Sequence, residues 1–400
     1  MNVCLIAPAS PFLINQDVMG HLGLWYLGSA LREAGHQVLY CDLGLGDEIP
    51  LADVYGVTGM SPQASQVLEL PSRLRQVSSK ALLVGGGPYL SLRPQDGIEA
   101  GYDLIIQGEG ERVFVHILAS EGSEQYPIIH APRNYDLDAL AFPDRSQAGR
   151  YHYAVDGVGA TTMITSRGCP YRCAFCCTSI WGGRYRERSP QNVYMEMAAL
   201  RKQGWGAVMF YDDTLALNQE RLAQLCSLIS PLGMRWRCFA RGDQLSEDVA
   251  LLMAGAGCAE VLIGVESGSD RILKNIRKGE SKRQIAAGIA AARKVGMRVK
   301  ALFIVGLPGE DRRSLEETET FVRDIQPDDV DFTLLSVFDG SPIARNPEEY
   351  DVCVLRTGGW YKGRPGQYAS TVATSSLSAK EITAARDHLE ATFKVKEKLV

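Results

Sequence analysis

Short apolar runs alternate with helical stretches along most of this chain, and this alternation restricts its fold more than any other feature. In the first part of the chain, strand-like runs are expected at 2–7, 37–42, 53–59, 80–85 and 103–107. Helically spaced apolar residues separate them, at 20–35, 64–78, 90–100 and 110–120. Strands that alternate with helices form a parallel sheet covered on both faces. We therefore predict an α/β domain over residues 1–125.

The same alternation resumes after a linker that we expect over residues 126–158. Strands are predicted at 161–166, 206–211, 235–240, 260–266, 298–304 and 329–336, with helices between them. Strand–helix units in such a series form an incomplete (βα)6 barrel, which we assign to 159–345. A C-terminal segment, 346–400, completes the chain with a closing helix near 375–385. Its glycine- and aromatic-rich stretch, 358–366, is either a surface loop or a lid over a substrate.

The composition excludes several classes of protein. A hydrophobic content of 46% and a charged content of 22% are ordinary for a globular protein. The net charge of −5 gives no basis for a nucleic-acid partner, which would favour a basic surface. No apolar run reaches the roughly 20 residues that span a bilayer, and no export signal is visible. We therefore expect a cytoplasmic protein with neither a membrane nor a nucleic-acid partner.

Three of the ten cysteines are closely spaced, in the run Arg167-Gly-Cys-Pro-Tyr-Arg-Cys-Ala-Phe-Cys176. Cys169, Cys173 and Cys176 have the spacing C-x-x-x-C-x-x-C, and an aromatic residue, Phe175, precedes the last of them. Three thiolates so close in sequence can hold one iron–sulfur cube and leave its fourth iron without a protein ligand. An open iron can bind a small molecule and pass it an electron.

Two other uses of cysteine fit this run less well. A structural zinc site normally has four ligands, but no histidine lies near the loop and Cys177 is too close to Cys176 to occupy an opposite corner. Disulfides are typical of secreted chains, and no export signal is visible in this sequence. We interpret Cys177 as a bystander packed beneath the loop, and the other scattered cysteines as small buried hydrophobic residues.

Small residues follow the predicted strands of the first domain, where a parallel sheet binds its ligands. They form the runs Thr58-Gly-Met-Ser-Pro62, Gly85-Gly-Gly-Pro88 and Gly108-Glu-Gly-Glu111. Glycine allows a close approach between backbone and ligand. A dinucleotide fingerprint would instead follow the first strand as G-x-G-x-x-G. The run Ala7-Pro-Ala-Ser-Pro11 is no such turn, so a nicotinamide or flavin domain is disfavoured.

These motifs, taken in order, resemble those of the cobalamin-dependent radical SAM enzymes. The resemblance covers residues 3–345, including a linker-like run at 137–145. It implies a Rossmann-like cobalamin-binding domain followed by a partial radical SAM barrel, with a 4Fe–4S cluster on the three cysteines, S-adenosylmethionine and cobalamin as cofactors. It also implies that the cobalamin contacts are Ser61, Gly85, Gly86, Gly87, Gly108, Glu109 and Gly110. The cobalt-ligating D-x-H-x-x-G motif of many cobalamin proteins is absent. His21 has the wrong spacing, and we interpret it as structural.

The resemblance assigns the remaining cofactor contacts to the barrel. Phe175 lies in the cluster loop. Asp212 and Asp213 follow the second strand, where carboxylates suit the amino group of S-adenosylmethionine or cap the next helix. Arg241 follows the third strand and suits the methionine carboxylate. Glu266 follows the fourth strand, where an unpaired buried glutamate would be unfavourable. The run Gly306-Leu-Pro-Gly-Glu310 matches a motif whose backbone flanks the adenine.

The implied activity is reductive cleavage of S-adenosylmethionine to a 5′-deoxyadenosyl radical, a reaction that the cofactors perform and the protein orients. The leading hypothesis is a cobalamin-dependent methyltransferase acting on an unactivated carbon of a small metabolite. A second is a radical SAM enzyme that does not methylate, with cobalamin as an electron carrier or absent. A third is a non-catalytic redox sensor or binding protein. The expected partners are a small-molecule substrate and an external flavodoxin- or ferredoxin-type electron donor.

Overall fold

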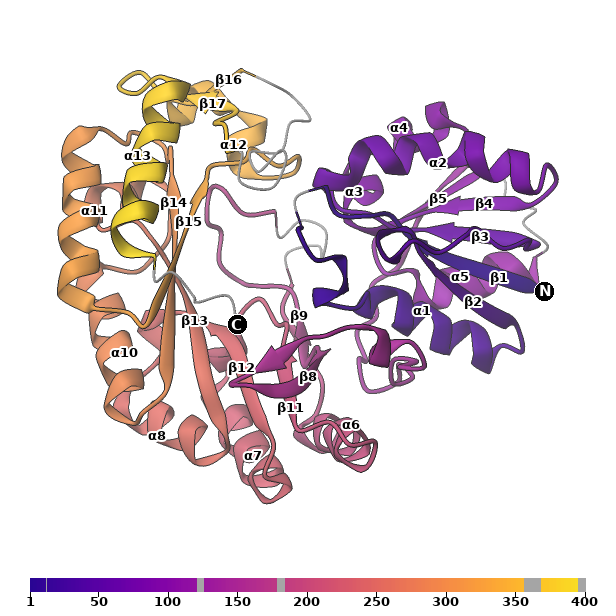
Figure 1. Ribbon diagram of the computed structural model, residues 1–400, viewed down its shortest axis with the longest axis horizontal. Coiled ribbons are helices and arrows are strands. Elements are labelled where there is room, and N and C mark those ends of the chain that lie inside the picture. The colour runs from indigo at the N-terminus through magenta and orange to yellow at the C-terminus, as the bar shows by residue number, and fades with distance from the viewer. Residues whose placement is uncertain (12, 121–125, 178–183, 356–367, 395–400) are drawn as a thin grey trace. The chain divides into compact units, whose positions relative to one another are not determined.

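The computed structural model describes residues 1–11, 13–120, 126–177, 184–355 and 368–394 (Figure 1). These residues form two compact units, the first comprising Met1–Tyr153 and the second the described residues from Ala154 onward. In these described ranges no helix is both long enough and apolar enough to cross a membrane. The predicted lid stretch, 358–366, lies outside the described residues.

A six-stranded parallel sheet forms the centre of the first unit, in the order β2-β1-β3-β4-β5-β6. Its strands are β1 (Asn2–Ala7), β2 (Gln37–Asp42), β3 (Val54–Val57), β4 (Leu82–Gly85), β5 (Leu104–Gln107) and β6 (Ile128–His130). Its helices are α1 (Leu22–Glu33), α2 (Ala64–Val77), α3 (Gly87–Leu92), α4 (Pro94–Ala100) and α5 (Gly110–Ala119). The order reverses between β1 and β3, and this kind of sheet binds ligands at such a reversal.

The continuous apolar runs of this unit form strands because both faces of the sheet are covered. Along β1, Cys4 and Ile6 belong to one buried cluster, whereas Val3, Leu5 and Ala7 belong to another. Successive side chains of a strand point to opposite faces, so an uninterrupted apolar run fills two cores at once. The predicted α/β class is confirmed.

Two local features differ from the expectation. The predicted helix over 90–100 is two helices, because Arg93 leaves the helical conformation and Pro94, which has no N–H to donate, starts the second. The linker contributes β6, which pairs with β5 through Ile105–Ile128 and Gln107–His130. Three residues are too few to give a strand pattern in sequence.

The second unit is built on a seven-stranded sheet in the order β15-β14-β13-β12-β11-β8-β7, in which only β7 is antiparallel to its neighbour. These strands are β7 (Ala154–Val155), β8 (Val158–Met163), β11 (Ala207–Phe210), β12 (Arg235–Ala240), β13 (Cys258–Glu266), β14 (Arg298–Val305) and β15 (Asp329–Leu334). Two short pairs accompany it, β9 (Ser166–Arg167) with β10 (Arg186–Glu187) and β16 (Cys353–Val354) with β17 (Val372–Ala373). The six parallel strands match the predicted partial barrel.

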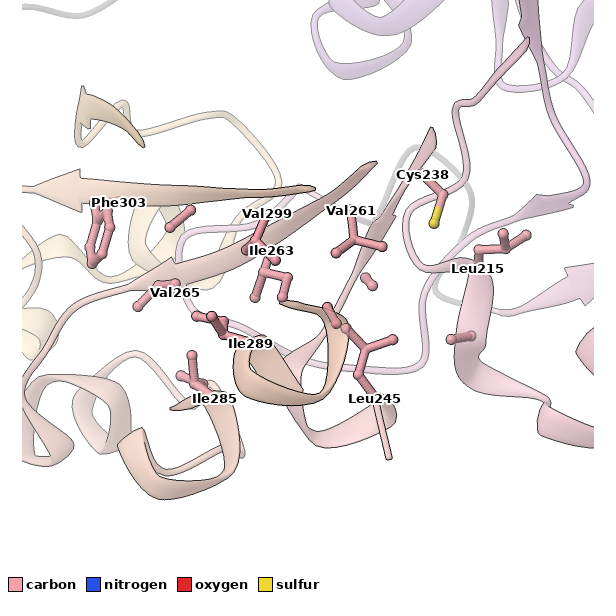
Figure 2. Packing of buried hydrophobic residues seen from close by; sticks show 14 of the residues in the cluster. Leu215, Cys238, Leu245, Val261, Ile263, Val265, Ile285, Ile289, Val299 and Phe303 are labelled. Atoms are coloured by element: carbon pink, nitrogen blue, oxygen red, sulfur yellow. The ribbon is translucent and has the colours of Figure 1, made fainter. Parts of the chain in front are cut away.

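Helices cover the outer side of this curved sheet, where α7, α8, α10 and α11 follow one another in Figure 1. The helices of the unit are α6 (Pro190–Lys202), α7 (Gln219–Ile229), α8 (Glu247–Gly255), α9 (Asp270–Asn275), α10 (Lys282–Lys294), α11 (Arg312–Ile325), α12 (Pro342–Arg345) and α13 (Ala379–Phe393). Figure 2 shows Val261, Ile263 and Val265 of β13 pointing toward Ile285 and Ile289 of α10, all within one buried cluster. The alternate residues of β13 therefore face the opposite, inner side of the sheet.

The last helix, α13, covers the free edge of β15 with side chains. Arg386 Nε donates to the carbonyl of Phe332 at 2.9 Å, and Glu390 Oε2 accepts from the amide of the same residue at 3.4 Å. Lys394 Nζ donates to the carbonyl of Val330 at 2.7 Å. An edge strand exposes unpaired backbone groups that invite pairing with other chains. Three polar side chains satisfy these groups where a further strand would otherwise lie.

Candidate functional site

The loop after β8 and β9 brings the three predicted cluster cysteines together. Cys173 raises the pKa of the Cys169 thiol, and Cys169 and Cys173 both raise that of Cys176, so the three thiols share one electrostatic environment. Burial, with the neighbouring Cys173 and Cys169, raises the pKa of the Cys176 thiol to about 12. Thiols in such surroundings stay protonated until a positively charged centre binds them.

Three backbone and side-chain contacts fix this loop to the rest of the second unit. The amide of Ala174 donates to the carbonyl of Ile276 at 2.8 Å, and the carbonyl of Ala174 accepts from the amide of Ile343 at 3.1 Å. Cys177 Sγ donates to the carbonyl of Asp339 at 2.9 Å. The Cys177 thiol is thus engaged by another chain segment, which does not suit a fourth ligand.

The donor set fits an iron–sulfur cube better than a single metal ion. In the described part of the chain, no group of three or more His, Cys, Asp or Glu side chains is placed to hold one metal ion. A cube separates its thiolate ligands more widely than one ion does, and three cysteines without a fourth protein ligand leave one iron open. Phe175 beside Cys176 is half-buried and packs against the core of the second unit.

The two aspartates after β11 have different surroundings. Asp212 is buried and accepts from the amide and hydroxyl of Thr165, each at 3.0 Å, and from the hydroxyl of Ser166. Its oxygens are thus occupied in holding the start of the cluster loop. Burial and the charge of Asp212 raise the pKa of Asp213 to about 6, and the carboxyl of Asp213 acts electrostatically on Cys169 and Cys176. Of the pair, Asp213 faces the cysteines.

Arg241 follows β12 and is 6% exposed, with its guanidinium already engaged by carboxylates. Nε and Nη2 each lie 3.0 Å from an oxygen of Asp243, and Nη2 lies 3.3 Å from Glu280 Oε2. The ring of Tyr171, in the cluster loop, lies under the guanidinium, with its centroid 3.6 Å from Cζ. The predicted carboxylate-binding arginine is therefore also part of a network within the chain.

Glu266 ends β13 in the left-handed region, with φ of +66°, at an irregularity in the pairing with β14. A non-glycine residue there is strained, and such strain collects at binding sites. Glu266 Oε1 lies 3.1 Å from Lys278 Nζ, which lies 3.5 Å from Glu280 Oε2. Burial lowers the pKa of Lys278, but the charges of Glu266 and Glu280 outweigh this effect and raise the pKa above its ordinary value.

Lys278 and Glu280 lie at this site, although neither is among the site residues predicted from the sequence. Both are buried, and both act electrostatically on Cys173. With Arg241, Asp243 and Glu266 they form a network of two cations and three carboxylates beside the cluster loop. The run Arg277-Lys-Gly-Glu280 was the available signal, because a lysine and a glutamate flank a glycine soon after a strand that ends in glutamate.

Glu310 closes the loop between β14 and α11. Its carboxyl is buried, and it accepts from the amides of Gly306, at 2.6 Å, and Leu307. Burial raises its pKa to about 7. These hydrogen bonds thus fix the backbone of the predicted adenine-flanking motif.

In the first unit, the predicted cobalamin contacts lie at or just after the carboxyl ends of β3, β4 and β5. Packing explains two of the glycines: a Cβ on Gly85 would lie 2.6 Å from the side chain of Leu90, and one on Gly87 would collide with Thr58. Backbone conformation explains Gly108, whose φ is +96°. These three glycines are therefore required by the fold itself.

Gly86 differs, because neither packing nor conformation requires a glycine there. Its backbone is extended, and the nearest atom to an added Cβ is the carbonyl oxygen of Ile106, at an ordinary 3.5 Å. The absence of a side chain leaves the backbone accessible to a bound group at close range. The hydroxyl of Ser61 makes no hydrogen bond to any other described residue, so it is available to such a group. At Gly110, a Cβ would lie 3.2 Å from Leu27.

Two polar residues of the first unit are held by neighbours. Glu109 is buried, and its Oε2 accepts from the amide of Asn134 at 3.2 Å. His21 Nε2 lies 3.0 Å from Asp42 Oδ2, which also accepts from Tyr151 Oη at 2.6 Å. His21 directly precedes α1 and is anchored to β2, in agreement with its structural interpretation.

Family comparisons agree with this geometry. Residues 163–322 match the radical SAM superfamily, and residues 16–118 match the B12-binding domain. The chain therefore belongs to the radical SAM superfamily. More particularly, it is a radical SAM enzyme of the cobalamin-dependent kind, whose cofactors are a 4Fe–4S cluster, S-adenosylmethionine and cobalamin. The predicted family, fold class and cofactors are confirmed.

Individual relatives extend over most of the chain. An uncharacterized methyltransferase of Pyrococcus horikoshii is 28% identical, over 90% of this chain and 86% of the relative. An anaerobic magnesium-protoporphyrin IX monomethyl ester cyclase of Cereibacter sphaeroides is 25% identical, over 80% of this chain and 58% of the relative. The solved structure of the radical S-adenosylmethionine methyltransferase TsrM from Kitasatospora setae, with cobalamin and a [4Fe–4S] cluster bound, matches with a TM-score of 0.78. It is 18% identical and covers 97% of this chain and 90% of its own, so the likeness concerns the fold.

Proposed function

We propose that this protein is a cobalamin-dependent radical SAM methyltransferase that acts on an unactivated carbon of a small metabolite. The observation that carries the proposal is the pairing of a B12-binding domain with a three-cysteine radical SAM domain in one chain. The relative from Pyrococcus horikoshii, named a methyltransferase, supports methyl transfer over other outcomes. When bound, the three cofactors supply the radical and the methyl group.

The protein's own residues then bind and orient these groups. In this proposal Cys169, Cys173 and Cys176 hold the cluster, and Asp213 accepts the amino group of S-adenosylmethionine. The buried cations Arg241 and Lys278 attract its carboxylate. Glu266, held in a strained conformation, offers its second oxygen to the ribose or the amine. Glu266→Ala should weaken binding of S-adenosylmethionine while the iron content stays unchanged.

An aromatic pair is the candidate contact for the substrate. Tyr211 follows β11 and is 46% exposed, and its ring meets that of Phe239 on β12 edge to face, with centroids 5.9 Å apart. Both are half-exposed neighbours at the strand ends that carry Asp213 and Arg241. An exposed aromatic pair suits an apolar or planar part of a small molecule.

Labelled methyl transfer tests the proposal. The anaerobically reconstituted protein is incubated with a chemical reductant, S-adenosylmethionine carrying a deuterated methyl group, and a small-molecule extract of cells. We expect 5′-deoxyadenosine together with a product that contains the deuterated methyl group. The matched control, with all three cluster cysteines changed to alanine, should yield neither.

The relative named as a cyclase favours a second candidate, a radical reaction without methyl transfer. In that case the same incubation yields 5′-deoxyadenosine and a changed substrate mass, but no deuterium in the product. That result would replace the methyltransferase proposal with the cyclase-like one. Under both candidates we infer an external electron donor of the flavodoxin or ferredoxin type and a small-molecule substrate.

A further inference from the structure

Tyr171 connects the cluster loop to the buried ion network through its ring face. It lies between Cys169 and Cys173, and the Cζ atom of Arg241 is 3.6 Å from its ring centroid. A guanidinium held over an aromatic face is attracted by the ring, more strongly where water is excluded. Because Arg241 is 6% exposed, this stack is largely shielded from solvent.

The side chain of Tyr171 is also fixed through its hydroxyl. Gln244 Nε2 donates to Tyr171 Oη at 3.2 Å, and Thr214 Oγ1 donates to Gln244 Oε1 at 2.6 Å. Gln244 and Thr214 are both buried. The loops after β11 and β12 therefore set the orientation of one aromatic ring in the cluster loop.

This arrangement places a positive charge beside the cluster ligands. The guanidinium of Arg241 acts electrostatically on the thiols of both Cys169 and Cys173, and the amide of Tyr171 donates to the Cys169 thiol. The carboxylates of Asp243 and Glu280 contact the same guanidinium and offset its charge, so its effect on the thiols depends on how close the guanidinium itself is held to them. Reduction adds one electron to a cluster, and nearby positive charge and hydrogen bonds to its sulfurs favour that more negative state.

We propose that Tyr171 is a positioning residue that holds the Arg241 guanidinium against the cluster and thereby raises the cluster's reduction potential. In the step concerned, the oxidised cluster takes one electron from an external reductant, and no bond forms or breaks. The proposal rests on the cluster assignment to the three cysteines, and it is independent of whether the enzyme methylates its substrate.

Two substitutions of Tyr171 distinguish the contribution of its ring from that of its hydroxyl. Tyr171→Leu removes the stacking face, so that only Asp243 and Glu280, which are not part of the cluster loop, still hold the guanidinium. We expect the ratio of reduced to oxidised cluster at a fixed potential to fall about tenfold, which is 59 mV for a one-electron couple. Tyr171→Phe keeps the face and should keep the potential of the unaltered protein.

A second tyrosine–arginine stack in the same unit provides the matched control. Arg386 on α13 lies over the ring of Tyr368, with Cζ 3.7 Å from the centroid. Tyr368→Leu removes an equivalent stack at the edge of β15 and should leave the potential unchanged. A shift there as large as in Tyr171→Leu would overturn the proposal, because any lost stack would then have the same effect.

The experiment is an anaerobic redox titration of the reconstituted full chain, without S-adenosylmethionine, followed by electron paramagnetic resonance of the reduced cluster. Unchanged potentials in Tyr171→Leu would overturn the proposal. If Tyr171→Leu fails to hold a cluster, Arg241→Gln decides, since loss of the charge must lower the potential, and an unchanged value would refute the inference. A lack of any 4Fe–4S signal in the unaltered protein would instead refute the cluster assignment.

Discussion

Glu310 allows a quantitative test of how burial affects this fold. The residue is 1% exposed, and the hydrogen bonds to its carboxyl come from two amides of its own loop. Burial raises its pKa from an ordinary 4.5 to about 7. At 1.36 kcal/mol per pKa unit, ionising this group in the folded protein costs about 3 kcal/mol more than in the unfolded chain.

The sign of the pH dependence follows from the direction of that pKa change. The folded pKa lies above the unfolded one, so the protonated group stabilises the fold fully below pH 4.5, and this contribution is lost as the pH rises through about 7. Glu310→Gln stays neutral throughout. We therefore expect the stability of the variant relative to the unaltered protein to increase by about 3 kcal/mol between pH 4 and pH 8.

Urea unfolding of the cluster-free full chain at the two pH values measures this difference, with tryptophan fluorescence as the signal. Glu316→Gln, at an exposed position of α11, is the matched control and should give the same relative stability at both pH values. A relative stability of Glu310→Gln that is equal at pH 4 and pH 8 would refute the reasoning, because the carboxyl would then titrate alike in both states.

Three further substitutions follow from the site. Changing Cys169, Cys173 and Cys176 together to alanine should abolish iron binding and the brown colour, and an iron content near four per chain would contradict the cluster assignment. Asp212→Asn should lower the free energy of unfolding by about 1–3 kcal/mol, measured in urea, because its acceptor oxygens hold the loop start. Lys278→Met should destabilise the fold by about 3–5 kcal/mol in the same assay, since it removes the cation that pairs with the buried Glu266 carboxylate.

The main strands of this fold could be predicted from the sequence, because strands buried on both faces consist of continuous apolar runs. β1, β2 and β12 have the predicted bounds, and the cysteine spacing located the cluster loop. These signals are local, so a single window of sequence contains them. β6 escaped detection because a three-residue strand has too few positions to show a pattern.

The arrangement around the cysteines was less accessible because it depends on pairing across long sequence separations. Asp212 and Asp213 are equivalent in sequence, and only the position of Thr165 distinguishes the buried carboxylate from the one that faces the thiols. The same holds for Lys278, whose partner Glu266 lies on another element. The strand ends that carry the chemistry can be predicted from local sequence patterns, whereas the different roles of adjacent side chains depend on their positions in the folded chain.

Because α13 covers the free edge of β15, the order in which the two are synthesised affects how the chain folds on the ribosome. A ribosome makes β15 before α13, and domains begin to fold as they emerge. Until Arg386, Glu390 and Lys394 have left the ribosome, the backbone groups on the free edge of β15 have no partner. Nascent chains held close together on one messenger RNA would be most exposed to edge-to-edge pairing during that interval. Slow translation just before residue 379 would therefore reduce the yield of correctly folded protein even though the sequence is unchanged.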